Sequence, residues 1–535
     1  MRRIRSHLNV RSDDYKSNRQ SNLARARILR DLQKTVRFDR PERDRQRLER
    51  QGKLFVRERL DLLLDPGSPF LELSSLAANR AYGGEIAGGG QVAGIGVVSG
   101  REVLVHASDS AVKGGALYPL GVKKVLRAME IALENRLPVV HLVDSAGAFL
   151  PLQAEIFADK QMGGRIFRHQ CVMSAMGIEQ VAVVLGHCTA GGAYIPTLSD
   201  YSIMVRGTGG VFLGGPPLVK AATGEEVSAD ELGGADVHAS ISGTADYAVD
   251  SEAEGIELAR EIVGMLRRRP KTAIDMREPE EPFYDPQEIY GIVPDDIKKQ
   301  FDMREVIARI VDGSLFHEYK PDLGTTLVCG FAYLWGYKVG IVGNNGVLFS
   351  DSAHKATNFM QICDRDAIPL IFLQNITGFM IGKEYEHSGI TKDGAKMLMV
   401  QANVRVPKFT VITNGSFGAG NYAMTGRAFD PRFLFSWPNS QISVMGAEQA
   451  AKTLAQIKVA ALRRKGQVLS SDEIAAIEQP IYEEYAAQSD AYFATSEVWD
   501  DGIIDPTDTR NTLGMAISAS LNAPFANPAQ GILRI

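Results

Sequence analysis

A pattern that occurs twice limits the folds open to this chain. Residues 137–147 are an apolar run that ends in a small-residue turn, and residues 368–378 repeat that form. A later apolar run ends in the pair Gly191-Gly192, and its counterpart ends at residues 418–420. Each second copy lies about 230 residues after the first, which is the size of a domain and too long for a solenoid unit. The sequence therefore predicts a duplicated domain in which the two glycine turns are equivalent.

The segments around these runs predict the α/β class. Apolar strands are expected in the first half at 92–98, 102–107, 138–143 and 181–185, with amphipathic helices at 121–135 and 164–176. The second half repeats the rhythm, with strands at 327–333 and 338–346 and a helix at 351–363. Strands that alternate with helices favour a parallel sheet with crossover helices.

Two segments lie outside this pattern. Residues 12–50 are rich in arginine, and their apolar positions fit one face of a helix that packs on the main body or on a partner: Leu23, Ala26, Ile28, Leu29, Leu32 and Val36. A helix is also expected from Gly52 to Leu60. Residues 268–290 are rich in charge and proline, as domain linkers are. Because 535 residues exceed a single core, we divide the chain into domains 1–275 and 276–535.

The two glycine turns are candidate anion sites. Each places small residues where a strand runs into a helix start, and the first amides of a helix lack internal partners. Glycine turns also occur where a strand and a helix only pack closely, so one turn alone decides nothing. Their recurrence at matched places favours two oxyanion sites, whose backbone donors contribute roughly 3 kcal/mol each to a developing enolate.

Two more small-residue segments lie at predicted strand ends, Lys113-Gly114-Gly115 and Ser145-Ala146-Gly147-Ala148. Ligands of open α/β sheets bind at the carboxyl ends of strands, but turns also pack there, so both roles stay open. The chain has no G-x-x-x-x-G-K-[ST] segment, and a P-loop nucleotide site is therefore not supported.

No acid–base pair or metal site stands out. His187, His354 and His387 lack ligand spacing, and neither Ser145 nor Ser416 has a G-x-S-x-G context. The four cysteines form no C-x-x-C pair, which argues against a zinc ribbon and a disulfide framework. An enzyme built on these turns would take its base from a cofactor.

Charge and hydropathy exclude two classes of protein. The net charge of -5 argues against a nucleic-acid binder that relies on a basic field. No apolar run reaches the length of a membrane span. The first 12 residues are basic, but Asp13 and Asp14 follow at once, unlike a transit peptide. We therefore expect a cytoplasmic protein rather than one of the mitochondrial matrix.

From about residue 10 onward, the chain closely resembles the carboxyltransferase (β) subunits of biotin-dependent acyl-CoA carboxylases. The resemblance is carried by Val112-Lys-Gly-Gly, Val143-Asp-Ser-Ala-Gly-Ala, Thr189-Ala-Gly-Gly-Ala-Tyr, Gly343-Asn-Asn-Gly, Gln374-Asn-Ile-Thr-Gly-Phe-Met and Gly418-Ala-Gly-Asn-Tyr. It implies two crotonase-like (ββα-superhelix) domains and a β hexamer with active sites between the first domain of one protomer and the second of another. It also implies an α subunit, in an α6β6 holoenzyme, that carries the biotin carboxylase and biotin-carrier domains. This chain has no Ala-Met-Lys-Met biotinylation sequence, so biotin would come on that partner; no metal is implied.

The resemblance also implies residue roles. The amides of Gly191 and Gly192 hold the thioester oxygen of the acyl-CoA, and those of Ala419 and Gly420 hold the biotin oxygen. Carboxybiotin releases CO2, the biotin anion removes a γ proton from a 3-methyl-2-enoyl-CoA, and the γ carbon attacks CO2. The acyl-CoA is bound by Lys113, Gly114, Gly115, Ser145, Ala146, Gly147, Ala148, Gly163 and Gly164. Biotin is bound by Val347, Phe349, Thr377, Gly378, Phe379 and Gly418.

Within the family, the chain is most similar to the 3-methylcrotonyl-CoA and geranyl-CoA carboxylase branch. Methylcrotonyl-type relatives carry an aromatic residue before a Gly-Arg pair, whereas this chain reads Met162-Gly-Gly-Arg165. Without that ring the pocket has room for a longer acyl group, so we expect geranyl-CoA, with 3-methylcrotonyl-CoA as the alternative. Weaker alternatives are a crotonase-type hydratase, which would need matched carboxylates, a decarboxylase subunit coupled to a membrane pump, and a non-catalytic scaffold.

Overall fold

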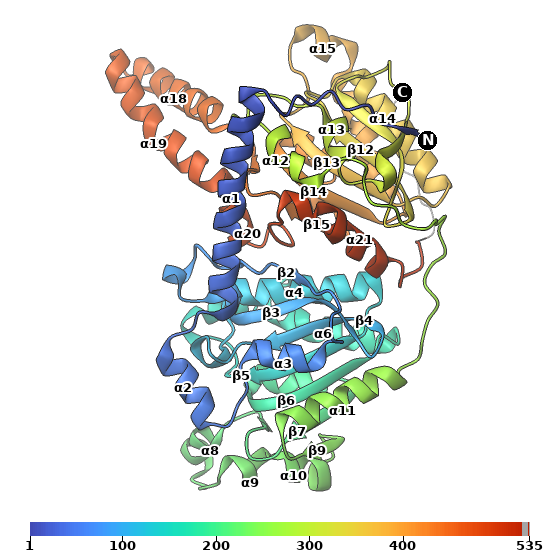
Figure 1. Ribbon diagram of the computed structural model, residues 1–535. Helices are drawn as coiled ribbons and strands as arrows, with labels where there is room; N and C mark the ends of the chain where they lie inside the picture. Colours follow the sequence, from blue (N-terminus) through green and yellow to red (C-terminus); the bar gives the residue numbers. More distant parts are fainter. Residues whose placement is uncertain (527–532, 534–535) are drawn as a thin grey trace.

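The computed structural model describes residues 1–526 and residue 533, and each half of the chain builds a sheet, the second of which also takes in the N-terminal strand β1 (Figure 1). Eight described strands form the first sheet in the order β2-β3-β4-β5-β6-β7-β9, with β8 beside β6. Strands β2 to β4 are antiparallel, and β4 to β7 are parallel. Their bounds are β2 Leu71–Leu73, β3 Gln91–Val98, β4 Arg101–Ser108, β5 Val139–Ser145, β6 Gln180–Thr189, β7 Tyr201–Val205, β8 Gly210–Phe212 and β9 Tyr247–Val249.

The second sheet repeats the first. Its order is β1-β10-β11-β12-β13-β14-β15, with β16 beside β14, and it changes from antiparallel to parallel pairing at the equivalent strand, β12. The bounds are β1 Arg2–Arg3, β10 Leu315–Glu318, β11 Leu327–Leu334, β12 Tyr337–Asn344, β13 Leu370–Ile376, β14 Lys408–Phe417, β15 Phe433–Ser436 and β16 Gln441–Ser443. The predicted α/β class and the duplication are confirmed.

The central strands are buried on both faces. All seven residues of β5 and of β13 are buried, and so are all ten of β14. Near-continuous apolar runs of this kind are typical of parallel strands with helices on both sides. The predicted crossover helices are present as α4 (Pro119–Asn135), α6 (Gly163–Ala175) and α14 (Ser350–Arg365), within one or two residues of their expected starts.

Two buried lysines show how closely the halves match. Lys124 of α4 donates from Nζ to the carbonyl oxygens of Gly88 and Gln91, at 3.0 and 2.7 Å. Lys355 of α14 donates in the same way to Leu323 and Leu327, at 2.9 and 2.8 Å. Each ammonium group therefore donates hydrogen bonds to backbone carbonyls where the chain enters the first hairpin of its sheet. A hydrophobic pattern in the sequence cannot predict a buried lysine of this kind.

The N-terminal segment is helical, as predicted, and spans both halves. Helices α1 (Asp13–Phe38) and α2 (Glu42–Arg50) lie along one side of the molecule, where α1 packs on α12 (Ile289–Ile292) and Arg37 pairs with Glu72 (Figure 1). The expected apolar face was wrong at Ile28, which is 53% exposed. The expected helix from Gly52 begins instead at Val56 as α3 (Val56–Leu63), because the Glu58 carboxylate accepts from the Phe55 amide and caps it there.

The connection between the halves is extended. Helix α11 (Glu252–Met265) ends the first half, and residues 267–285 then run along the outside of the molecule to the second (Figure 1). The largest apolar cluster joins the halves, because it includes Val125 and Met129 of α4 together with Leu513 and Ile517 of α21 (Thr509–Ser520).

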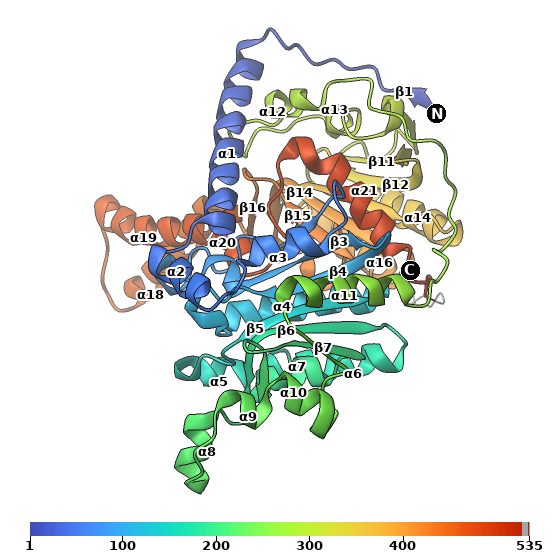
Figure 2. The same cartoon turned by 60° about the horizontal axis from the view of Figure 1, so that its bottom comes forward.

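Two helical features project from the body. Helices α18 (Ala447–Arg464) and α19 (Ser471–Ser489) form a hairpin on one side, and α8 (Pro216–Thr223) stands out at the far end of the first half (Figure 2). None of the described helices has the length and apolar composition that crossing a bilayer requires. The other helices are α5 Gln153–Ile156, α7 Tyr194–Thr197, α9 Ala229–Gly233, α10 Ala235–Val237, α13 Met303–Ile307, α15 Lys383–Ser388, α16 Ile390–Asn403, α17 Gly418–Ala423 and α20 Ala491–Ser496.

Candidate active site

The two glycine turns have the same backbone geometry. After β6, Ala190 has a φ of 53°, and after β14, Gly418 has a φ of 56°. In both turns the next residue, Gly191 or Ala419, is exposed, and the one after it is buried. A short helical segment follows each turn, so the amides at these positions belong to a first helical turn, where N–H groups lack intrahelical acceptors. Each turn is thus able to present backbone donors to an anion.

Steric surroundings differ between the turns. A Cβ atom on Gly420 would lie 2.5 Å from Cγ1 of Ile376, so only glycine fits without a shift. A Cβ atom on Gly192 would lie 3.8 Å from the Ser145 carbonyl oxygen, an ordinary contact. The first turn therefore has free space beside its amides, which a larger residue would fill.

The two segments predicted to bind the acyl-CoA lie together beside the first turn. The Ala146 amide donates to the Gly114 carbonyl at 3.2 Å, and the Ser145 hydroxyl donates to the Gly115 carbonyl at 2.9 Å. Gly115 has a φ of 74°, and a Cβ there would lie 2.2 Å from the Asp144 carbonyl oxygen. Gly147 also has positive φ and is buried. Three members of the set are exposed and form its outer surface: Lys113, Ala146 and Ala148.

The residues predicted to bind biotin form the same arrangement in the second half. The Leu348 amide donates to the Gly378 carbonyl at 3.1 Å, as the Leu117 amide donates to Gly147 at 2.8 Å in the first. This bond places Val347 and Phe349 beside Thr377 and Phe379, and Gly378 lies next to Gly420, 3.2 Å from the position of a Cβ there. The Phe349 ring contacts Tyr385, and that of Phe379 covers Gly394. Thr377 is exposed and lines a cavity of about 480 Å³ with Phe417, Lys298 and Tyr482.

A buried charge network lies behind the first turn. The Asp144 carboxylate accepts from Lys53 at 2.9 Å and from Arg59 at 3.2 Å, and Arg59 also binds Glu252 at 2.6 Å. Burial alone would raise the pKa of Asp144, but Lys53 and Arg59 outweigh it and hold that pKa below its usual value. The carboxylate fits because residue 186 is a glycine: a Cβ atom at that position would lie 1.9 Å from Oδ1 of Asp144 and overlap it. The network anchors the bulge between β5 and β6, where pairing skips from Val143 to Ser145.

The second half has a bulge at the equivalent place, between Gln374 and Ile376, but a neutral network. There Asn375 accepts from Asn414 at 3.2 Å. Closer to the turn, Ser416 donates to Gln374 at 2.5 Å and accepts from Asn421 at 2.8 Å. The same backbone shape is therefore held by charges in one half and by amides in the other.

Helix α6 brings an aromatic wall to the first turn. Gly163 and Gly164 begin α6, and Phe167 follows one turn later on the face of Gly163. The Phe167 ring lies 3.5 Å from the position of a Cβ on Gly191, and its centroid is 5.8 Å from that of Tyr194. Our sequence reasoning missed both aromatic residues, although the four-residue spacing from Gly163 could have pointed to Phe167.

Two of the three lone histidines have structural partners. His354 pairs with Asp393 at 2.8 Å, and the ring of His187 packs against Phe212. Burial and then Lys53 lower the pKa of His187, which keeps that ring neutral near pH 7. His387 lies exposed on α15.

Comparison with known proteins agrees with this geometry. Residues 47–532 match the model of the carboxyl transferase domain. A probable mitochondrial methylcrotonoyl-CoA carboxylase beta chain of Drosophila melanogaster is 52% identical over 99% of this chain and 95% of its own length. The biotin-dependent 3-methylcrotonyl-coenzyme A carboxylase beta1 subunit of Mycobacterium tuberculosis is 53% identical, over 92% and 93%. Among solved structures, the beta subunit of P. aeruginosa geranyl-CoA carboxylase matches with a TM-score of 0.90 and 45% identity, over 99% of each chain.

These matches cover almost the whole chain at identities well above those at which only a fold is shared. They confirm the two crotonase-like domains that the resemblance implied. The residue roles at the two turns stay predictions. The chain belongs to the carboxyl transferase family, among the beta subunits of biotin-dependent acyl-CoA carboxylases in the methylcrotonyl-CoA and geranyl-CoA branch.

Proposed function

We propose that this chain transfers a carboxyl group to the γ carbon of a 3-methyl-2-enoyl-CoA, with the acyl-CoA on domain 1–275 and biotin on domain 276–535. The observation that carries the proposal is the matched pair of turns at 190–192 and 418–420, which share their φ values and their pattern of exposure. Two anion sites of one geometry suit a reaction in which negative charge passes between two bound reactants.

In this proposal backbone amides stabilise the negative charges that develop on both reactants. Removal of a γ proton gives a dienolate, whose charge reaches the thioester oxygen on the amides of Gly191 and Gly192. The amides of Ala419 and Gly420 hold the biotin oxygen, and the side chains that form the hydrogen-bond network behind this turn are neutral. Biotin, on a partner α subunit, supplies the carboxyl group and the base when bound. The site suits biotin because Gly378 and Gly420 lie next to each other without side chains, so no side chain of these two residues covers the backbone amides.

Replacing Gly192 separates an enzyme from a scaffold. Gly192→Val would fill the space beside Ser145 and displace the thioester oxygen, so we expect carboxylation by the reconstituted holoenzyme to fall roughly 100-fold or more. Gly264→Ala on α11, where a new Cβ makes only ordinary contacts, is the control. Full activity of the Gly192 variant would favour a non-catalytic subunit, and hydration of the enoyl-CoA without bicarbonate would favour a hydratase.

We infer geranyl-CoA as the substrate from the residues at the start of α6. Gly163 and Gly164 carry no side chain at the start of α6, one helical turn before Phe167, whose ring lies beside Gly191. The second candidate, 3-methylcrotonyl-CoA, is favoured by the relatives at 52% and 53% identity, which bear that name, whereas the geranyl-CoA relative is 45% identical. Overall sequence identity averages over the whole chain, whereas the length of the acyl group that is accepted depends on the few residues that surround it. The residues at the start of α6 are therefore the better indicator of the substrate.

The choice is tested by measuring kcat/KM for both CoA esters. We expect geranyl-CoA to be preferred, and Gly163→Phe to reduce turnover of geranyl-CoA far more than that of 3-methylcrotonyl-CoA. Because a Cβ at this position lies 3.2 Å from the Ile156 carbonyl oxygen, Gly163→Ala is the matched control for strain in the helix. A wild-type preference for 3-methylcrotonyl-CoA would overturn the assignment without affecting the proposed reaction.

The proposal includes assembly with further chains. Large apolar side chains near the turns and on the projecting helices are each more than 60% exposed: Leu150, Phe157, Leu213, Leu218, Ile381, Val444 and Ile457. Exposed apolar area of this extent is typical of protein interfaces, so we propose a β hexamer in which a second copy of this chain covers them. Light scattering of the isolated chain should give six protomers, and a monomer at micromolar concentration would contradict this.

We also propose a cytoplasmic location. Relatives from Drosophila and Dictyostelium are named as mitochondrial proteins. In this chain, however, Arg2 and Arg3 pair with β10, and the His7 amide binds Glu305 at 2.7 Å. The basic start is thus a folded part of the second half, and this supports the proposed location. Cell fractionation of the native host would test it.

A further inference from the structure

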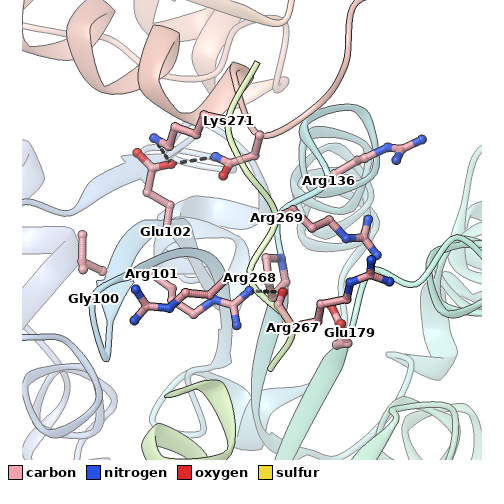
Figure 3. A pocket seen from close by; sticks show the side chains of 12 residues that line it. Gly100, Arg101, Glu102, Arg136, Glu179, Arg267, Arg268, Arg269 and Lys271 are labelled. Carbon is pink, nitrogen blue, oxygen red and sulfur yellow. Dashed lines mark hydrogen bonds and ion pairs between the residues drawn. The ribbon is translucent and has the colours of Figure 1, made fainter. Parts of the chain in front are cut away.

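A cavity of about 350 Å³, whose lining side chains are drawn in Figure 3, lies at the amino ends of the strands of the first sheet. The glycine turn follows the opposite end of β6. It lies where β4 begins at Arg101, where β5 is preceded by Pro138, and where β6 is preceded by Glu179. We call it the linker pocket, because four of its lining residues, Arg267, Arg268, Arg269 and Lys271, belong to the connection between the halves. Strand β6 has ten residues, so the pocket lies roughly 30 Å from the turn that follows its other end.

The lining of the linker pocket is strongly cationic. Five arginines take part: Arg101, Arg136, Arg267, Arg268 and Arg269. Lys271 also lines it, but its ammonium pairs with Glu102 at 2.7 Å, and Asn522 donates to the same carboxylate at 2.7 Å. Glu179 is then the only carboxylate of the described lining that is left to face five guanidinium groups.

Several of these arginines lack counter-ions. Arg101 donates to backbone carbonyls of Val263 and Arg267, and Arg269 donates to that of Gly177. Within the described part of the chain, the side chains of Arg136, Arg267 and Arg268 make no hydrogen bond or ion pair. Burial lowers the pKa of Arg101, Glu179 opposes this, and Arg268 and Arg269 lower that pKa further, as expected where positive charges crowd. The fold thus holds an excess of positive charge that an anion would relieve.

The geometry points to a compact polyphosphate anion as the ligand of the linker pocket, of the kind present in nucleoside di- and triphosphates and in inorganic polyphosphate. Guanidinium groups bind phosphate oxygens in pairs of parallel hydrogen bonds, and several arginines match several phosphates. A cavity of this volume holds a small molecule, whereas an extended acidic segment of a protein would need a longer groove. A bound anion would tie the linker to the first sheet, beside Glu102 and Lys271.

Calorimetric titration of the full-length chain with sodium tripolyphosphate tests the proposal, at constant ionic strength and with sulfate in parallel. We expect saturable binding of one anion per chain, with at least tenfold weaker affinity in the double variant Arg136→Gln/Arg268→Gln. The control, Arg463→Gln/Arg464→Gln, removes the same charge from the end of α18 and should bind as the wild type does. No saturable binding, or equal weakening in both double variants, would overturn the proposal.

Two further arms identify the ligand. Binding of tripolyphosphate should be unchanged in saturating coenzyme A; displacement by coenzyme A would place the anion in the acyl-CoA site and overturn the proposal. If ATP binds as tightly as tripolyphosphate, the pocket recognises only the phosphates. If ATP binds more than tenfold more tightly, the pocket also contacts the nucleoside. Both results support the linker pocket, and they distinguish the two sources of polyphosphate.

Discussion

At the scale of single residues, equivalent positions have taken on different chemistry. Asp144 in the first half and Asn375 in the second lie within equivalent bulges, yet one is a buried carboxylate with two cationic partners and the other a neutral amide. A buried carboxylate is tolerated only because Lys53 and Arg59 are present, and Glu252 balances Arg59 in turn. The stability of the first turn therefore depends on side chains that lie far apart in the sequence.

Replacing Asp144 should expose this dependence. Asp144→Asn would leave the Lys53 ammonium buried without its carboxylate, and such a loss costs about 3 kcal/mol or more. We expect the melting temperature of the chain to fall by several degrees. The control is Glu448→Gln, which removes a carboxylate from exposed pairs with Lys298 and Lys452 and should leave the melting temperature unchanged. If both variants melt alike, the network contributes nothing to stability.

At the scale of the elements, the core of the first sheet contains a titratable pair. His106 of β4 and His141 of β5 are paired in register, with their Nδ1 atoms 3.1 Å apart, and Nε2 of His106 lies 3.0 Å from Oε1 of Gln91. The contact between the two Nδ1 atoms forms only while at least one ring is neutral, because two protonated rings would point an N–H group at each other. Burial and then the neighbouring ring lower the pKa of His106 to about 3, and burial lowers that of His141 to about 4.

The histidine pair predicts a loss of stability in mild acid. Unfolded histidines take up protons below about pH 6.5, whereas the folded pair resists until about pH 4, so its contribution is complete above pH 6.5 and shrinks as the pH falls. The fall in melting temperature between pH 7.5 and pH 5.5 should be smaller in His106→Gln than in the wild type. His387→Gln, at an exposed site, should keep the wild-type difference. Equal pH dependence in all three proteins would contradict the prediction.

The elements that the sequence predicted are those with strong local patterns. Strands β5, β6, β13 and β14 are continuous apolar runs, and apolar residues recur with helical spacing in α4, α6 and α14. The predicted bounds of these elements therefore agree with the structure to within a few residues. The two-residue strand β1 and the Lys124 and Lys355 contacts could not be found in this way, because they depend on pairing between distant segments. For the same reason the sequence showed the glycine turns but not Phe167, Tyr194 or the network around Asp144.

At the scale of the whole molecule, one buried ion pair fastens the halves together. Arg127 of α4 binds Asp501 at 2.8 Å and also donates to the carbonyl oxygen of Arg432 at 3.0 Å. Asp501 accepts a second guanidinium from Arg427, at 2.8 Å. Burial would raise the pKa of Asp501, but Arg127 and Arg427 outweigh it and hold that pKa far below its usual value.

Loss of Arg127 should loosen the joint between the halves. Arg127→Met would leave Asp501 with one cationic partner and would remove the donor to the carbonyl oxygens of Pro431 and Arg432, at a cost of about 3–5 kcal/mol. We expect earlier melting, and faster cleavage of the extended connection at 267–285 by trypsin. Arg463→Met on α18 removes an exposed charge and should change neither property. Unchanged melting and cleavage would show that the apolar cluster alone joins the halves.

The pairing of β1 with β10 has a consequence for synthesis in the cell. During synthesis Arg2 and Arg3 leave the ribosome about 300 residues before their partners, Phe316 and Leu315. The first half can form its own sheet during that interval, while β1 stays unpaired because β10 has not yet been synthesised. Strand β1 therefore joins its sheet only after the linker and β10 have emerged, and a bulky group attached beside β1 would interfere with this late step rather than with folding of the first half.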